Sequence, residues 1–305
     1  MSANITESLP LVTLVTVTYN AEKDLHEFLA CYNSLVNCRL ELVVVDNASS
    51  DDTVKVLNEF CSPRSDVKLI KNTSNMGVAF ANNQGINYAL NKGADWIILI
   101  NNDVSFGANL AYELTFGHDD LIATPLIPYY HNRKEIWFSS GGFSALRGFT
   151  GTHYNKNKDV SIYRPEGIYY SEYAPTCCMA IRSNVFDNVG LMDEDYFVYF
   201  DDTDFCWRLL QSGYRIRLLS GSRLYHKVGA STGGSHSPFT VSYTSRNRVV
   251  FLRKNKGMKW TILFLPVFIS YYTYIYLIKS WSPSLMSIAF KGILSGLMLP
   301  LTSES

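Results

Sequence analysis

Three polar residues, Asn101, Asn102 and Asp103, directly follow the apolar run Trp96–Ile100. The run is long enough for a strand that is buried on both faces. The polar residues then stand at its carboxyl end, where open α/β sheets bind their ligands. One carboxylate with two amides suits a hard divalent cation and the phosphates that it bridges. For this stretch taken alone, the alternative is a polar turn that caps the next helix.

A second acidic group consists of Asp201, Asp202 and Asp204, which follow an aromatic stretch and begin an amphipathic helix. Helix capping and dipole compensation are worth about 0.3–1 kcal/mol per charge, but three carboxylates exceed what one cap needs. Their mutual repulsion should raise at least one pKa, which suits a general base. Asp204 and Arg208 stand one helical turn apart, and we expect them to be structural partners.

The elements that must position these residues follow a regular alternation. The predicted strands are residues 11–17, 40–45, 67–70 and 95–100. Segments with helical apolar spacing separate them, so the pattern predicts a parallel sheet with helices on both faces. Thr18, Asp46, Asn75 and Asp103 follow the strands, and we expect them to converge on one edge as a nucleotide site. Asn20 is expected to cap the first helix.

Several classes of protein are excluded or disfavoured by missing patterns. No G-x-G-x-x-G follows the first strand and no G-x-x-x-x-G-K-[ST] occurs, which argues against a dinucleotide-binding Rossmann domain and a P-loop NTPase. Lys+Arg and Asp+Glu both number 27, so net charge gives no argument for nucleic-acid binding. Six cysteines without a C-x-x-C pair, and no secretory signal, favour a reducing cytosolic compartment.

Four motifs in a fixed order carry a resemblance to a known family. They are Val15–Asn20, Val44–Asp51, Asn75–Gly77 with Ala81–Gly85, and Asn101–Asp103. Their order and spacing resemble the donor half of family 2 glycosyltransferases. These enzymes have the GT-A fold, a Rossmann-like α/β domain with a mostly parallel central sheet flanked by helices. We therefore expect this fold class for the chain.

The resemblance implies roles at the predicted sheet edge. Asp46 would hold the base or ribose of a nucleoside diphosphate sugar. Asp103, at the last position of the family's D-x-D motif, would bind a divalent cation (Mg²⁺ or Mn²⁺) and the diphosphate. The other expected donor-binding residues are Thr18, Tyr19, Asn20, Asn75, Gly77, Asn82 and Asn102. Many members have Asp where this chain has Asn101, whereas the rhamnosyltransferase-like branch often carries N-x-D; the missing carboxylate should weaken metal binding.

The second acidic group resembles the family's acceptor-side signature. By that match Asp202 is the catalytic base, and Asp201 stands where Glu is commoner. His226 occupies the position at which related enzymes have a His that joins the metal or the diphosphate, although a lone histidine is more often structural. We expect Asp103 and His226 to hold the cation.

The C-terminal part has a membrane signal. Residues 246–259 contain a basic cluster of six Lys and Arg residues, Trp260–Ile278 has no charge, and Ser284–Leu301 is a second apolar stretch. A transmembrane helix, an in-plane hairpin and a buried packing helix are the alternatives. The many tyrosines favour interfacial helices that lie on an anionic leaflet, held there by the basic cluster.

These expectations combine into one hypothesis. Residues 1–245 form the GT-A domain, with a donor half at about 1–104 and an acceptor half at about 105–245, and residues 246–305 form the membrane-associated region. The chain would be an inverting glycosyltransferase at the cytoplasmic face of the cell membrane, peripheral or monotopic. It would transfer a sugar from a nucleoside diphosphate, first dTDP-rhamnose and then a UDP-hexose, to a saccharide or lipid-linked saccharide of a surface polysaccharide. The rivals are a sugar nucleotidyltransferase and a degenerate nucleotide-sugar-binding protein.

Overall fold

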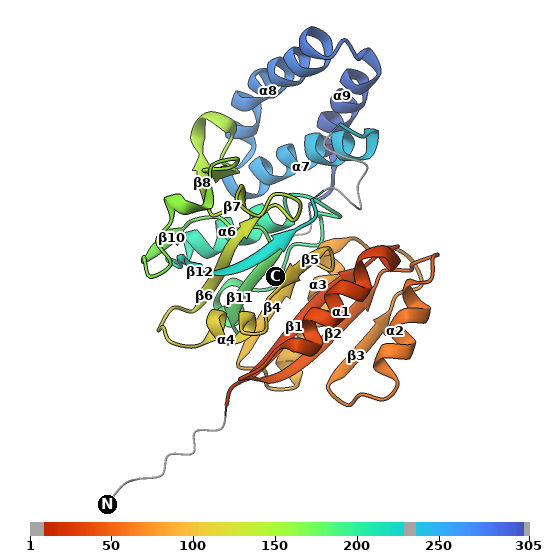
Figure 1. Cartoon of the computed structure of the whole chain (residues 1–305). Coiled ribbons are helices and arrows are strands. Elements are labelled where there is room, and N and C mark those ends of the chain that lie inside the picture. Colours follow the sequence, from red (N-terminus) through yellow and green to blue (C-terminus); the bar gives the residue numbers. More distant parts are fainter. Residues whose placement is uncertain (1–8, 229–235, 302–305) are drawn as a thin grey trace, which may run out of the picture.

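The protein is described by a computed structural model that covers residues 9–228 and 236–301. A mixed sheet runs through its centre in the order β10-β12-β6-β11-β4-β1-β2-β3. Helices cover both faces of this sheet, and the C-terminal helices project from one end of the molecule (Figure 1). The α/β architecture that the sequence predicted is confirmed.

The donor half is the parallel part of the sheet. Its elements are β1 (Leu11–Thr18), α1 (Glu22–Ser34), β2 (Arg39–Asp46), α2 (Thr53–Cys61), β3 (Val67–Lys71), α3 (Val78–Asn91) and β4 (Trp96–Ile100). The four strands pair in parallel, and α1 lies in front of β1 and β2 whereas α3 lies behind them (Figure 1). Every residue of β4 is buried, as its apolar run predicted.

The acceptor half extends the same sheet with mixed strand directions. Its elements are β5 (Val104–Phe106), α4 (Leu110–Thr115), β6 (Ile122–Pro128), β7 (Ile136–Phe138), β8 (Ser140–Ser144), β9 (Thr150–Tyr154), β10 (Tyr169–Ser171), β11 (Cys178–Arg182), α5 (Val185–Val189), α6 (Asp201–Gln211) and β12 (Ile216–His226). Because β11 is antiparallel to both β4 and β6, and β12 is parallel to β6, the carboxyl ends of β4, β6 and β12 share one edge.

Strand β12 is continuous from Ile216 to His226. Its register against β6 shifts between Leu219 and Arg223, so the Ser-Gly-Ser stretch at residues 220–222 is an irregularity within one strand. Its continuity carries His226 to the carboxyl edge of the sheet.

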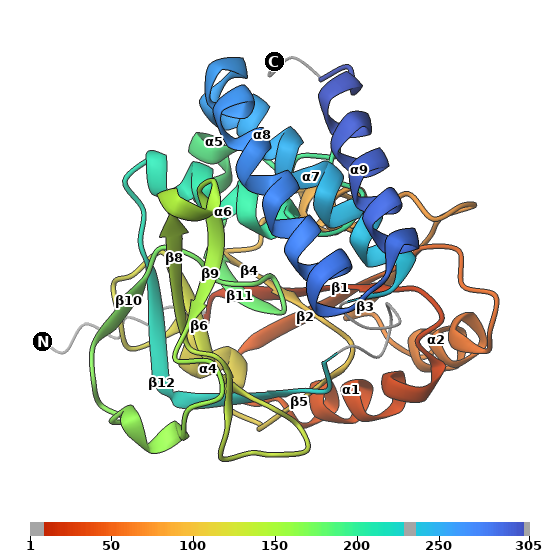
Figure 2. The same ribbon diagram turned by 90° about the horizontal axis from the view of Figure 1, so that it is seen from above.

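The C-terminal helices are α7 (Pro238–Lys256), α8 (Met258–Thr273) with a π-helical continuation (Tyr274–Lys279), and α9 (Pro283–Met298). Helix α7 runs without a break across the predicted domain boundary at 245 and 246. Helix α9 packs closely on α7 at Gly292 and Gly296. A side chain at either position would collide with Ser245 or the backbone of Arg246, so the glycines permit this close packing. Figure 2 shows α8 and α9 side by side above α7.

The basic cluster does not form a free cationic surface. Five of its six side chains contact carbonyl oxygens, carboxylates or aromatic rings of the protein itself: Arg246, Arg248, Arg253, Lys254 and Lys256. Only Lys259 of the cluster is classed as exposed, together with Lys279 and Lys291 further along the hairpin. Most charges of this cluster are therefore engaged within the protein, and its contact with an anionic leaflet stays a prediction.

The outer face of α8 is apolar and exposed. Met258–Lys279 is long and apolar enough to cross a bilayer by length and composition, and only 22% of its most apolar window is buried. Ile262, Leu263 and Ile278 are 60%, 62% and 70% exposed. Because most of this helix faces outward, a buried packing helix fits the structure worst of the three alternatives.

Candidate active site

The ends of β1 and β2 hold a buried carboxylate. Thr18 and Asp46 are paired in register, and the Thr18 hydroxyl donates to Asp46 Oδ1 over 3.0 Å. The Ser49 hydroxyl donates to the same oxygen over 2.5 Å, and its backbone N–H donates to Oδ2 over 3.0 Å. These bonds fix the side chain of Asp46, which is 1% exposed, at the predicted edge of the sheet.

The turn after β1 is tied to the turn after β2. Asn20 adopts a left-handed conformation (φ 50°), and its side-chain oxygen accepts a hydrogen bond from the backbone N–H of Ser50 over 2.8 Å. The expectation that Asn20 caps α1 was wrong, because Ala21 occupies the cap position and Asn20 is used between the two turns. Tyr19 is 48% exposed in the same turn, so its ring is accessible to a ligand.

Asn47 organises the loop after β3, although the sequence did not single it out as a site residue. Its Nδ2 donates to Asn75 Oδ1 over 2.8 Å, and its Oδ1 accepts from the backbone N–H of Met76 over 3.1 Å. Gly77 has φ 89° and lies directly against the backbone of Phe197, where a side chain would collide. The loop that contains Asn75 and Gly77 therefore contacts the acceptor half.

Helix α3 provides a second link of this kind. Asn82 is buried on α3, 6% exposed. Its neighbour Asn83 donates to the carbonyl oxygen of Met192 over 2.8 Å and to Glu194 Oε1 over 2.9 Å, and accepts from the Met192 N–H over 2.9 Å. The sequence could have indicated Asn83 only through its place in the third motif.

The turn after β4 brings together the two predicted metal ligands. Asn102 Nδ2 donates to the carbonyl oxygen of Val17 over 2.5 Å and so fastens this turn to β1. Strand β5 pairs with β12, Val104 against His226, and this pairing leaves Asp103 Oδ1 3.2 Å from His226 Nε2. Burial opposes ionisation of Asp103, but the contact with His226 outweighs it and lowers the pKa of this carboxyl.

This pair fits a divalent cation that shares its ligands with a substrate. Asp103 Oδ1 is buried and has no hydrogen-bond partner of good geometry, so it retains its capacity to bind a cation. Within the described residues, no group of three or more His, Cys, Asp or Glu side chains could hold a metal ion. A cation here would take its remaining ligands from diphosphate oxygens and water, as Mg²⁺ commonly does.

Asp202 lies in the first turn of α6 and is held by two neighbours. The Tyr173 hydroxyl donates to its Oδ2 over 2.7 Å, and the backbone N–H of Thr203 donates to its Oδ1 over 2.6 Å. Burial raises the pKa of Asp202, and burial together with the charge of Asp202 raises the pKa of Asp201. The predicted upward pKa shift is thus present, with burial rather than repulsion as its largest cause.

A row of aromatic side chains connects the two predicted centres. The ring centres of His226 and Trp137 lie 4.3 Å apart, those of Trp137 and His153 lie 5.2 Å apart, and those of His153 and Tyr173 lie 5.7 Å apart. Tyr173 then donates to Asp202. The structure therefore links Asp103 and His226 to Asp202 through a continuous row of contacting side chains.

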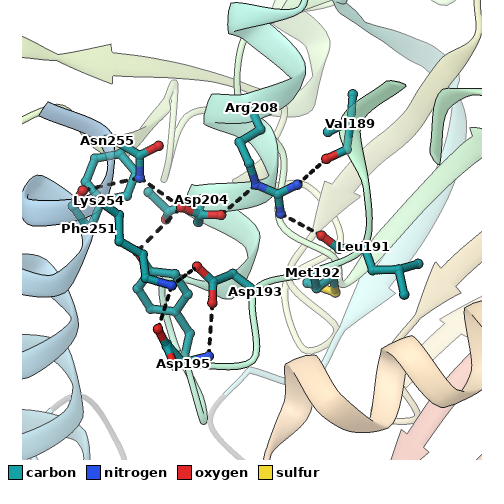
Figure 3. Close-up of polar contacts among 12 residues, drawn as sticks. Val189, Leu191, Met192, Asp193, Asp195, Asp204, Arg208, Phe251, Lys254 and Asn255 are labelled. Atoms are coloured by element: carbon teal, nitrogen blue, oxygen red, sulfur yellow. Dashed lines mark hydrogen bonds and ion pairs between the residues drawn. The ribbon is translucent and has the colours of Figure 1, made fainter. Parts of the chain in front are cut away.

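The predicted pair Asp204–Arg208 is structural, as expected. Arg208 Nε lies 2.8 Å from Asp204 Oδ2. Asn255 Nδ2 donates to the other oxygen of Asp204 over 2.8 Å, as Figure 3 shows. Arg208 and Asn255 thus engage both oxygens of this carboxylate, so Asp204 anchors α6 to α7.

Fold and site together define a glycosyltransferase of the GT-A class. The structure resembles that of GalNAc-T7 with UDP, GalNAc and Mn²⁺, with a TM-score of 0.67 and 17% identity; the likeness covers 94% of this chain and 55% of that one. The family model described as Glycosyl transferase family 2 matches residues 13–186, more than half of the chain. The chain belongs to this family, as the four motifs predicted.

Two curated relatives narrow the comparison to rhamnosyltransferases. A dTDP-rhamnosyl transferase RfbF of Shigella flexneri is 27% identical over 251 residues, which cover 79% of each chain. An N-acetylglucosaminyl-diphospho-decaprenol L-rhamnosyltransferase of Mycobacterium tuberculosis is 24% identical over 285 residues, which cover 85% of this chain and 90% of the relative. The resemblance to a rhamnosyltransferase-like branch of the family is confirmed.

Proposed function

We propose that this enzyme transfers a sugar from a nucleoside diphosphate donor to a saccharide hydroxyl with inversion, and that Asp202 is the general base. One observation carries the proposal: a continuous row of contacting side chains joins the Asp103–His226 pair to Asp202. The pair can hold charge at one end of this row, and Asp202, whose pKa is raised by burial, can accept a proton at the other.

The residues of the donor half bind and orient the nucleotide. Asp46 meets the base or ribose beside Thr18, Tyr19 and Asn20, and the loop of Asn75 and Gly77, with Asn82 behind it, closes the same edge. Asp103 and His226 would hold a divalent cation, and Asn102 keeps the turn of Asp103 in place. When bound, such a cation neutralises charge on the departing diphosphate.

The acceptor residues move one proton. Asp202 accepts the proton of the acceptor hydroxyl, whose oxygen then forms a bond to the anomeric carbon as the bond to the diphosphate breaks. Tyr173 orients Asp202 through its hydrogen bond. Trp137 and His153, which lie between the two centres, offer aromatic faces to the sugar.

The substrates follow from the relatives. Two curated relatives are rhamnosyltransferases by name, so dTDP-rhamnose is the proposed donor and a UDP-hexose the second candidate. The mycobacterial relative is named for a diphospho-decaprenol acceptor, which supports a lipid-linked saccharide as acceptor. The exposed apolar face of α8 would place the site at the cytoplasmic surface of the membrane, with Lys259, Lys279 and Lys291 as its exposed cations.

A donor panel with product analysis tests this proposal. Thermal shift with dTDP-rhamnose, UDP-glucose and GDP-mannose, each with and without Mn²⁺, should show stabilisation by the true donor, about 2.7 kcal/mol at 100 times its Kd. Release of nucleoside diphosphate that requires an acceptor supports a transferase. Pyrophosphate release would indicate a nucleotidyltransferase, and binding without turnover would indicate a nucleotide-sugar sensor.

A further inference from the structure

The last turn of α7 contacts α6, the segment that precedes α6 and the C-terminal hairpin. The four residues Arg253, Lys254, Asn255 and Lys256, which we name the α7 clamp, are consecutive in sequence. The three cationic members belong to the basic cluster that resembles a lipid-binding patch, but all four side chains contact the protein itself. Each makes its own set of contacts, and these sets are described in turn.

Lys254 neutralises two acidic residues on the segment that leads to Asp202. Its Nζ lies 2.5 Å from Asp193 Oδ2 and 2.6 Å from Asp195 Oδ2, and its side chain is only 9% exposed (Figure 3). Burial disfavours the charged amine, but the two carboxylates outweigh this and raise the pKa of Lys254. A charged, buried ammonium therefore pins both ends of the Asp193–Asp195 turn.

Asn255 holds the start of the catalytic helix. It donates to Asp204 Oδ1 over 2.8 Å while Arg208 binds the other oxygen. In the described part of the chain, Asp201 and Asp202 have no ion pair with Lys or Arg, whereas the acidic residues around them do. Lys254 thus neutralises the charge of Asp193 and Asp195, and Arg208 that of Asp204, whereas no Lys or Arg of the described residues forms an ion pair with the proposed base.

The other two members contact the C-terminal hairpin and the aromatic side of the site. Arg253 Nη1 donates to the carbonyl oxygens of Gly296 over 2.6 Å and Leu299 over 2.9 Å. The Lys256 amine lies 4.2 Å from the ring centre of Phe149 and 4.3 Å from that of Trp207. Trp207 belongs to α6, the helix whose first turn contains Asp202.

We propose that the α7 clamp positions Asp202 and that Lys254 is its principal positioning residue. Lys254 acts through Asp193, Asp195 and the ring of Tyr196, which lie on the segment that leads to Asp202. Through Arg253 the same turn joins the exposed hairpin to this segment, so the placement of Asp202 depends on how the hairpin is docked. The inference rests on the proposed role of Asp202.

The test compares Lys254→Met with Lys254→Arg and with Lys259→Met, which removes the same charge from an exposed position five residues further on. Lys254→Met should lower kcat at least tenfold with donor Kd within twofold of wild type. Lys254→Arg should retain most of kcat, and Lys259→Met should match wild type in soluble assays. Equal kcat in Lys254→Met and wild type would overturn the inference, as would equal losses in all three variants.

A second variant protects the test from misfolding. If Lys254→Met does not fold, Asn255→Ala removes one neutral contact and should still lower kcat with an unchanged donor Kd; a change in melting temperature alone would contradict a positioning role. Asp202→Asn is measured in parallel. If Asp202→Asn loses kcat but Lys254→Met keeps it, the clamp proposal fails and the proposed base stands. If Asp202→Asn keeps a normal kcat, the proposed base itself fails.

Discussion

Two regions of the molecule bury aspartates in opposite electrostatic surroundings: the donor edge, which is the carboxyl edge of the sheet around Asp103, and the acceptor edge, which is the first turn of α6 with Asp201 and Asp202. At the donor edge, His226 lies 3.2 Å from Asp103, and the pKa of this carboxyl is lowered despite burial. At the acceptor edge, Asp201 and Asp202 stand together without a Lys or Arg in ion-pair distance among the described residues, and burial raises their pKa values. The neighbours, rather than the residue type, decide whether an aspartate is a fixed anion or a proton acceptor.

The largest effect is expected at the acceptor edge. Asp202→Asn keeps size and polarity but cannot accept a proton, so kcat should fall by about 10²- to 10⁴-fold. The matched change Asp204→Asn weakens the pair with Arg208 and should act mainly on stability, by about 1–3 kcal/mol. Nucleoside diphosphate release and thermal melts measure both. A near-normal kcat in Asp202→Asn would transfer the role of base to Asp201.

A smaller effect is expected at the donor edge. Asp103→Ala removes the only carboxylate of the Asn-Asn-Asp turn, and donor affinity in the presence of Mn²⁺ should weaken by about 10- to 100-fold. Titration calorimetry with the nucleoside diphosphate, with and without Mn²⁺, measures this. The Mn²⁺ dependence of binding should disappear along with the affinity; if it persists unchanged, the turn has a purely structural role.

The pH dependence of kcat sharpens the comparison. A base must be ionised, and burial raises the pKa of Asp202 while Tyr173, Thr203 and the charge of His153 oppose that rise. The acid limb of kcat should therefore lie above the ordinary Asp range of about 3.9. Tyr173→Phe removes a hydrogen bond that lowers this pKa, so the limb should move to higher pH.

At acid pH this change should reduce kcat about tenfold, because a hydrogen bond to a charged group is worth about 1.5–3 kcal/mol. At alkaline pH, where Asp202 is ionised in both proteins, the two rates should converge. A uniform loss at every pH would show that Tyr173 acts on something other than the ionisation of Asp202.

The smallest catalytic effect is expected far from both edges. Ile262→Asp with Leu263→Asp places charge on the exposed face of α8 and should release the protein from anionic vesicles in a flotation assay, with donor Kd unchanged. Ile168→Asp, at an apolar position that is 66% exposed outside the hairpin, is the matched control and should still float. Retention of the double variant would argue against membrane contact through this face.

The sequence predicted the donor half well because its signals are local. The apolar run Trp96–Ile100 and the polar residues after it needed no distant partner to be recognised. The pairing of Asp103 with His226 depended on β5 and β12, which meet across more than a hundred residues, and only the family resemblance indicated it.

Other site residues could not be found in this way. Trp137 and His153 lie in short strands without a clear apolar period, and Tyr173 lies in the loop after β10. Nothing in their spacing showed that they form a row between His226 and Asp202. Lys254 was misinterpreted for the same reason: its partner Asp193 lies 61 residues upstream, and a basic run beside an apolar stretch is also the pattern of a membrane-bound helix.

The division of labour between the two edges is tested most directly by one paired experiment on Asp103→Asn and Asp202→Asn. Both variants are titrated with donor in the presence of Mn²⁺, and both are followed through a single turnover with saturating donor and acceptor. The account predicts that Asp202→Asn binds donor as wild type does and loses the turnover step, whereas Asp103→Asn loses donor affinity first. If Asp202→Asn turns over at a near-normal rate, or if both variants lose binding and rate in the same proportion, the two edges do not have the separate roles assigned to them.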